Sequence, residues 1–91
     1  MTVAVPRHAP NVQLRQDGEA TLLVVLPDDA GVVLDPTALA LWELCDGETT
    51  VQEMTLAVCA LYDATPETVE PDITGVLVRL EAAGLLEWVS R

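Results

Sequence analysis

Residues 34–54, LDPTALALWELCDGETTVQEM, contain the start of one helix and the turn that ends it. Asp35 stands before Pro36, and an N-cap carboxylate followed by a residue without an N–H favours a helix that begins at Pro36. Apolar residues then recur at three- and four-residue spacing, which predicts a face packed against a core: Ala38, Leu41, Trp42 and Cys45. Asp46-Gly47 ends the helix, so the segment predicts a short amphipathic helix followed by a reversal of the chain.

A second helix start follows this turn. Thr50 and Glu53 have the spacing of a capping box, in which each side chain accepts a hydrogen bond from the other residue's backbone amide. The helix over residues 51–62 has one apolar face that we expect in the core: Val51, Met54, Val58, Leu61 and Tyr62. Two helices joined by about four residues predict a helix-turn-helix corner.

Beyond this corner, the sequence predicts a third helix with an interrupted start. Residues 65–67, Thr-Pro-Glu, form a start signal, but Pro71 lies where its ring opposes a regular hydrogen-bond ladder. We therefore expect a short turn, then a kink or restart, and a main helix over residues 71–83. Gly84 should close it in the left-handed conformation, with residues 88–89 packed over the helix ends. The apolar stripe of this helix consists of Ile73, Val76, Leu77 and Leu80.

Three short strands are predicted before the helices. Residues 12–15 alternate apolar and polar, and residues 17–18, Asp-Gly, are a hairpin signal. Residues 21–26, TLLVVL, are apolar on both faces and suit a central strand. A turn rich in helix and strand breakers, residues 27–31, leads to a third strand at residues 32–34. The order of elements predicts an α+β domain in which a three-stranded antiparallel sheet is followed by three helices.

The ends of the chain carry weaker signals. Residues 1–11 have no periodic pattern, so we interpret them as a flexible arm attached to a domain of residues 12–91. His8 in this arm has no candidate catalytic partner close in sequence. Neither a signal peptide nor an apolar run long enough to cross a bilayer is visible, which favours a soluble, cytoplasmic protein without a membrane partner.

The charge balance decides between classes of partner. Fifteen acidic residues oppose four arginines, giving a formal net charge of −11. Proteins that bind nucleic acid usually present a basic face, so we expect no nucleic-acid partner. A partner with basic groups suits this charge, and an acidic surface that only maintains solubility is an equally good interpretation.

The residues needed for catalysis are scarce. Ser90 is the only serine, and no nucleophile–base arrangement, phosphate-binding loop or metal-ligand spacing is present. Cys45 and Cys59 each lie in a predicted helix, where buried free thiols are expected. The sequence predicts a protein that is not an enzyme and that has no catalytic residues, no metal and no cofactor.

Residues 34–86 resemble the PqqD family. Helix-start, turn and apolar positions carry the resemblance: Leu34, Thr37, Leu44, Cys45, Asp46, Gly47, Thr50, Val51, Glu53, Tyr62, Val69, Asp72, Leu77, Leu80, Gly84, Leu85 and Leu86. The resemblance implies a winged-helix-like domain that binds the leader of a ribosomally made precursor peptide. It also implies presentation of that peptide to a modifying enzyme, such as a radical SAM enzyme or a leader protease. The pathway could be pyrroloquinoline quinone biosynthesis, lasso-peptide biosynthesis or another, and the oligomeric state is open.

We hypothesise that the peptide adds a strand to the sheet edge formed by Val32, Val33 and Leu34. This edge carries no Lys, no Pro and no inward charge, which are the devices that usually block pairing. The third helix would form the other wall through four residues: Thr74, Gly75 for room, Val78 for an apolar anchor and Arg79 for an acidic leader side chain.

Two other interpretations stand beside this hypothesis. In the first, Val32 and Leu34 are core residues and Val78 is an incidental apolar surface residue. In the second, the protein is a winged-helix DNA-binding regulator, as its helix-turn-helix corner suggests. The charge of the second helix opposes this role, because it has no Lys or Arg to contact phosphate or bases.

Overall fold

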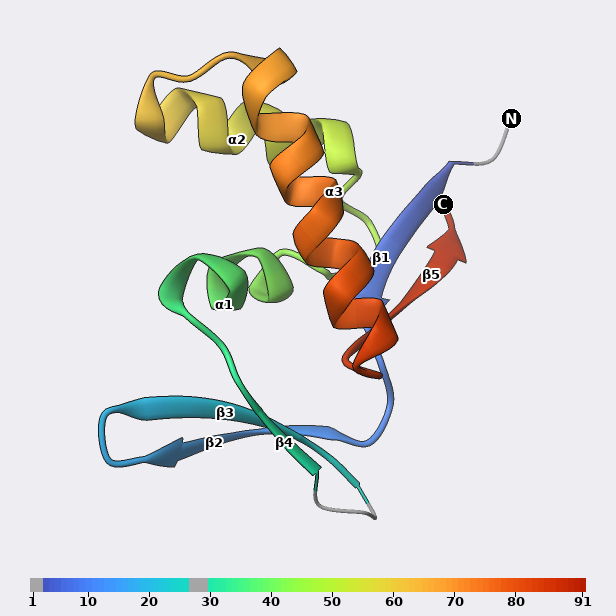
Figure 1. The fold of residues 1–91 in the computed structure, drawn as a ribbon. Helices are drawn as coiled ribbons and strands as arrows, with labels where there is room; N and C mark the ends of the chain where they lie inside the picture. The colour runs from blue at the N-terminus through green and yellow to red at the C-terminus, as the bar shows by residue number, and fades with distance from the viewer. Residues whose placement is uncertain (1–2, 27–29) are drawn as a thin grey trace.

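The computed structural model describes residues 3–26 and 30–91, which form an α+β domain with two sheets and three helices (Figure 1). In chain order the elements are β1 (Ala4–His8), β2 (Val12–Asp17), β3 (Ala20–Val25), β4 (Ala30–Val33), α1 (Pro36–Glu43), α2 (Val51–Tyr62), α3 (Pro66–Ala82) and β5 (Leu86–Ser90). The predicted class, a three-stranded antiparallel sheet followed by three helices, is confirmed, and a second sheet is added to it.

The first sheet is the predicted meander, with strand order β2-β3-β4 and antiparallel pairing throughout. Gly18 has φ +64° in the β2–β3 turn, a conformation that glycine adopts without steric cost. Leu23 on the central strand is fully buried, and its partners in the register are Leu14 and Val32. Of the predicted turn before β4, residues 27–29 lie outside the described residues, and the next two residues belong to β4.

The expectation of a flexible N-terminal arm is wrong for Ala4–His8. These residues form β1, which pairs antiparallel with β5 from Ala4↔Ser90 to His8↔Leu86. Val5 is 0% exposed, so the strand contributes a core side chain. Pairing and burial together outweigh the lack of sequence periodicity in this segment and the presence of Pro6 within it. Residues 88–89, which were expected to pack over the helix ends, belong to β5, and Trp88 packs against the core cluster.

The turn after α1 attaches β1 to the helices. The amide of Gly47 donates to the carbonyl of Pro6 at 2.9 Å, and the amide of His8 donates to the carbonyl of Cys45 at 3.0 Å. The His8 ring stacks on Trp42 with centroids 3.6 Å apart. His8, which had no assigned partner from the sequence, is therefore a packing residue. Cys45 and Gly47 in the family motif hold the N-terminal strand in place.

The core lies between α3, α1 and the sheets. Its buried residues come from every layer: Leu23, Leu41, Trp42, Cys45, Met54, Val69, Ile73, Leu77, Leu80, Leu85 and Leu86. The predicted stripes of α1 and α3 supply most of them, which confirms the helical periodicity. The predicted face of α2 is wrong at its end, because Leu61 and Tyr62 are 77% and 74% exposed. They occupy the last turn of α2, which extends beyond α3 in the view of Figure 1.

The predicted interruption of α3 is wrong. One continuous helix runs from Pro66 to Ala82 and includes Pro71. Pro71 is exposed, so water can hydrate the Glu67 carbonyl that loses its intrahelical donor. The C-terminus follows the prediction: Gly84 has φ +79°, and the Leu85 amide donates to the Leu80 carbonyl at 3.0 Å. This hydrogen bond, from the second residue after the helix cap back to Leu80, is typical of a Schellman motif.

The start of α2 makes stability depend on pH. Thr50 and Glu53 form the predicted capping box. In addition, the Arg91 guanidinium donates to the Glu53 carboxylate at 2.9 Å. The hydrogen bond from the Thr50 amide, then that from its hydroxyl and the charge of Arg91, lower the pKa of Glu53. A lowered folded-state pKa stabilises the protein above the unfolded pKa, and this contribution is lost as the pH falls through the folded pKa.

We expect the melting temperature of the parent protein to fall as the pH is lowered from about 6 to about 3. The variant Glu53→Gln should have a lower melting temperature at neutral pH. Its melting temperature should also depend less on pH, because position 53 no longer carries a carboxylate that can be protonated. Circular dichroism melts of both proteins across this range provide the measurement. Parallel profiles for the two proteins would contradict the assignment.

Candidate functional site

A groove separates β4 from α3 and has a volume of about 260 Å³. Its walls come from β4, the first turn of α1 and one face of α3: Val32, Val33, Leu34, Asp35, Thr37, Ala38, Val76, Arg79, Leu80 and Ala83. We call this set the edge groove. The Ala38 amide donates to the Asp35 carboxylate at 2.7 Å, which is the predicted cap of α1. This hydrogen bond fixes the Asp35 side chain where the groove meets the start of α1.

The outer edge of β4 offers backbone groups to this groove. The Leu34 amide donates to the Thr21 carbonyl at 3.4 Å, and Val33 pairs with Leu22 at the next step of the register. Bonded and non-bonded pairs alternate along an antiparallel ladder, so Val33 and Gly31 direct their N–H and C=O groups away from β3. No described strand pairs with this side of β4. The edge can therefore accept another extended chain.

The other edge of the sheet is less suited to this role. β2 is also a terminal strand, but it carries Arg15, a charged residue of the kind that discourages pairing. In its register the Asn11 carbonyl accepts from the Leu26 amide at 2.8 Å, so the same alternation directs the Leu14 amide outward. Among the described residues, β2 lines neither the groove beside β4 nor the other two hollows described below. The two edges therefore provide a matched comparison.

The structure brings together four of the seven residues predicted for the site. Val32, Val33, Leu34 and Arg79 all line the edge groove. Val32 and Leu34 are partly buried against the core cluster, as the alternative interpretation expected, and they line the groove as well. Val33 is 64% exposed, which leaves it available for contact.

The remaining three predicted residues lie elsewhere on α3. Thr74 and Gly75 border a shallow depression with the start of the helix, and a Cβ built on Gly75 would meet nothing within 4 Å. The open space around Gly75 therefore gives no close contact that would require a glycine at this position. Val78 is exposed, and at about 100° per residue it lies opposite the groove-lining Val76.

Sequence reasoning missed the residues that form most of the helical wall. Val76, Leu80 and Ala83 line the groove together with Arg79. Val76 and Leu80 were correctly placed in the apolar stripe, but a stripe was expected to face only the core. The spacing of three and four residues that links these four positions was the signal that could have found them.

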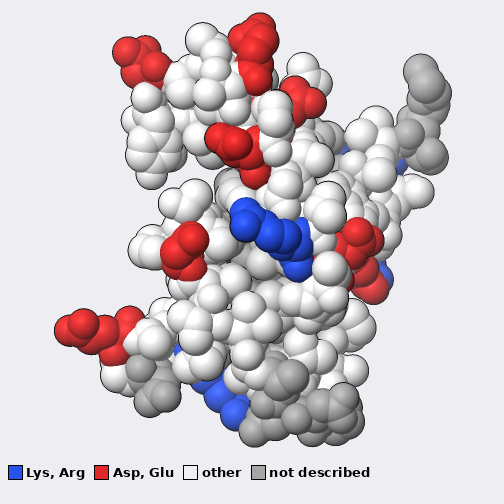
Figure 2. Space-filling model, viewed as in Figure 1, with Lys and Arg blue, Asp and Glu red and all other residues white. Residues whose placement is uncertain are grey.

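The edge groove contains one basic side chain in an acidic protein. Arg79 is the only Lys or Arg of α3, and no described carboxylate lies within salt-bridge distance of it. Arg7 and Arg91, by contrast, pair with Glu87 and Glu53. Figure 2 shows acidic side chains scattered over this face and a basic group over the C-terminal half of α3, near the centre of the view. The groove can therefore attract a carboxylate.

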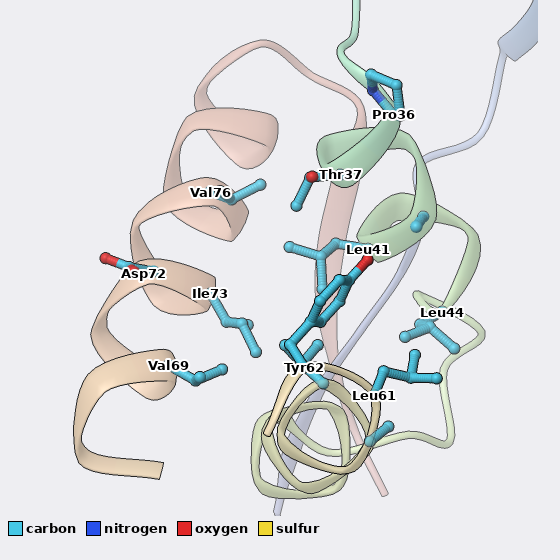
Figure 3. A pocket seen from close by; sticks show the side chains of 13 residues that line it. Pro36, Thr37, Leu41, Leu44, Leu61, Tyr62, Val69, Asp72, Ile73 and Val76 are labelled. Atoms are coloured by element: carbon cyan, nitrogen blue, oxygen red, sulfur yellow. The ribbon is translucent and has the colours of Figure 1, made fainter. Parts of the chain in front are cut away.

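A second hollow lies between α1, α2 and α3 and has a volume of about 380 Å³. We call it the helix cavity; its lining is Pro36, Thr37, Ala40, Leu41, Leu44, Ala57, Val58, Leu61, Tyr62, Val69, Asp72, Ile73 and Val76. In Figure 3, Val76 points from α3 toward Thr37 of α1, and Ile73 points from α3 toward Tyr62. The Tyr62 ring rises from α2 toward Leu41, and Asp72 points away. The space inside is therefore bounded by apolar side chains.

The described residues contain no arrangement typical of catalysis. Burial, followed by the nearby Asp46 carboxylate, raises the pKa of Cys45 to about 12, so this thiol stays protonated at neutral pH. Its Sγ donates to the Leu41 carbonyl at 3.3 Å, and Cys59 is also a free thiol. No group of three or more potential metal-ligating side chains gathers in the described part of the chain. None of its helices combines the length and apolar character needed to cross a membrane.

The fold and the edge groove define a class of protein: a small winged-helix-like domain with an open sheet edge facing a helix. Within this class the chain belongs to the PqqD family, since residues 23–86 match the family described as "Coenzyme PQQ synthesis protein D (PqqD)".

Relatives agree with this assignment. The bifunctional coenzyme PQQ synthesis protein C/D of Methylorubrum extorquens is 35% identical over 83 residues, which are 91% of this chain and 22% of that protein. This chain therefore spans about a fifth of the length of that relative.

Two solved structures share the fold. The complex of TbiB1 with the TbiA(beta) leader peptide has a TM-score of 0.75 at 26% identity, over 89% of this chain and 94% of that chain. The solution structure of the PqqD truncation of Methylobacterium extorquens PqqCD, a stand-alone recognition element for ribosomally synthesised and post-translationally modified peptides, has a TM-score of 0.72 at 34% identity. That likeness covers 91% of this chain and 88% of the truncation.

Proposed function

We propose that the protein is a non-catalytic recognition element that binds the leader of a ribosomally made precursor peptide and presents it to a modifying enzyme. The observation that carries the proposal is the open edge of β4, where the Val33 backbone faces the edge groove. A peptide paired there would form a fourth strand of the sheet β2-β3-β4. Family membership and the likeness to TbiB1, solved with a leader peptide, support the same reading.

The groove suggests how a leader would be recognised. Main-chain pairing with Val33 supplies affinity that depends little on sequence, so the side chains around the groove must supply selectivity. Val76 and Leu80 offer an apolar wall, and Arg79 offers a positive charge to an acidic leader residue. Thr74, Gly75 and Val78 remain outside this proposed binding surface.

The modifying enzyme would be a separate partner or a fused domain. The Methylorubrum extorquens relative is named as a bifunctional C/D protein, and this chain matches a fifth of it. A radical SAM enzyme or a leader protease is the class of partner we propose, in pyrroloquinoline quinone biosynthesis or a related pathway such as that of lasso peptides. The net charge of −11 suits a partner surface with basic groups.

Calorimetry with the synthetic leader encoded beside this gene tests the proposal. We expect saturable binding with a negative heat-capacity change, because apolar peptide side chains become buried in the edge groove. A random DNA duplex at about 50 mM salt, where non-specific binding is strong, is the comparison and should not bind. Binding of the duplex without binding of the leader would overturn the proposal in favour of the DNA-binding alternative.

A further inference from the structure

We propose that the helix cavity receives a large apolar side chain of the bound leader, beyond the segment that pairs with β4. This inference rests on the proposed function and specifies a kind of side chain that the peptide must carry. The occupant is a Leu, Ile, Met or Phe side chain of the same peptide that fills the edge groove.

The two hollows adjoin each other. Thr37 on α1 and Val76 on α3 line both the edge groove and the helix cavity. Thr37 lies in the first turn of α1, shortly after the end of β4. A peptide that leaves the edge groove at this end of β4 therefore meets the mouth of the helix cavity directly.

The chemistry of the cavity suits an apolar occupant. Leu41 and Ile73 on its inner wall are buried core residues, and Val76 is half-buried. Leu61 and Tyr62 at the end of α2 are 77% and 74% exposed, although both are large apolar side chains. A hydrophobic side chain inserted between α1 and α2 would cover these residues and remove apolar surface from water.

The spacing along α3 predicts where the apolar residue should be in the peptide. The edge groove extends along α3 to Leu80 and beyond, and the helix cavity is lined by Ile73, seven residues earlier. At 1.5 Å per helical residue this separation is about 10 Å. An extended peptide covers that distance in about three residues. The apolar residue should therefore lie about three positions outside the paired segment.

The test uses two alanines of α2 that differ in their relation to the cavity. Ala57 lines the helix cavity, Ala60 does not, and both are exposed. Ala57→Leu fills the cavity from within, whereas Ala60→Leu adds the same atoms elsewhere on the helix. Calorimetry with the synthetic leader should show affinity reduced about 10-fold or more for Ala57→Leu and changed by less than about twofold for Ala60→Leu.

A change in the peptide gives an independent readout. Replacing the leader's apolar residue outside the paired segment by alanine should weaken binding to the parent protein by a similar factor. When this peptide is combined with the Ala57→Leu variant, the two losses of binding free energy should not add. This arm does not depend on the folding of a variant. Non-additive losses would place both changes in one contact.

Each alternative result leads to a distinct conclusion. If the parent binds the leader and Ala57→Leu binds equally well, the inference is wrong and the proposed function stands. If the parent does not bind the leader, both are overturned. If Ala57→Leu abolishes a self-association seen by sedimentation velocity but leaves leader affinity unchanged, a second copy of the chain occupies the cavity and the inference is overturned.

Discussion

Replacing Val33 with proline is expected to weaken leader binding about 30-fold or more while the protein stays folded. Proline removes the N–H that Val33 directs away from β3, and its ring occupies the position that an incoming strand needs. The lost hydrogen bond would leave a peptide carbonyl unpaired in the groove, which costs about 1–3 kcal/mol before any steric term. Folding should be little affected, because edge strands tolerate proline where no ladder bond is lost.

The matched control is Leu14→Pro on β2. Leu14 also directs its amide outward from a terminal strand, and its side chain is half exposed. This variant has the same substitution at the same kind of position on a strand that does not line the edge groove, so it should bind the leader as the parent does. Calorimetry and thermal melts of the three proteins separate binding from folding. A folded Val33→Pro variant with parental affinity would show that the peptide does not pair with β4.

The largest expected effect on stability comes from Trp42. Its indole N–H donates to the Leu85 carbonyl at 2.9 Å, and its ring is buried beneath the stacked His8. Trp42 thus joins α1 to β1 and to the segment before β5. Trp42→Ala removes a large buried side chain and should lower the free energy of unfolding by about 3–5 kcal/mol. For a domain of this size that is a large fraction of the total stability.

Urea unfolding followed by circular dichroism gives the measurement. Tyr62→Ala is the control, because this aromatic residue is largely exposed and its loss should change the free energy of unfolding by about 0.5 kcal/mol or less. The loss of unfolding free energy in Trp42→Phe should lie between those of Trp42→Ala and Tyr62→Ala. Phenylalanine retains most of the burial, but it leaves the Leu85 carbonyl with the Ala9 amide as its remaining donor. A Trp42→Ala variant that loses less than about 1 kcal/mol would show that Trp42 does not hold these elements together.

Local chemistry in the sequence was sufficient for most of the secondary structure. The Asp35 cap, the capping box of Thr50 and Glu53, the Gly18 turn and the Gly84 stop are each formed within a few residues of chain, and all four are present. Their hydrogen-bond partners are near neighbours in sequence, so residue type and spacing suffice to predict them. The meander and the open β4 edge were likewise predicted from local sequence: short apolar segments separated by turn residues, and a last strand without residues that block pairing.

Only the tertiary structure decided the features that depend on distant partners. β1 forms because Val5 is buried and its strand pairs with β5, which is distant in the sequence: the partner of Ala4 is Ser90. No local pattern specifies that register. The exposure of Tyr62 depends on where α2 extends beyond the core. The face of α3 in the edge groove depends on the rotation of that helix against β4, which placed Val76 at the groove and Val78 opposite to it. Sequence periodicity identifies a helix and its apolar stripe, but packing against the rest of the chain determines which part of the stripe stays open.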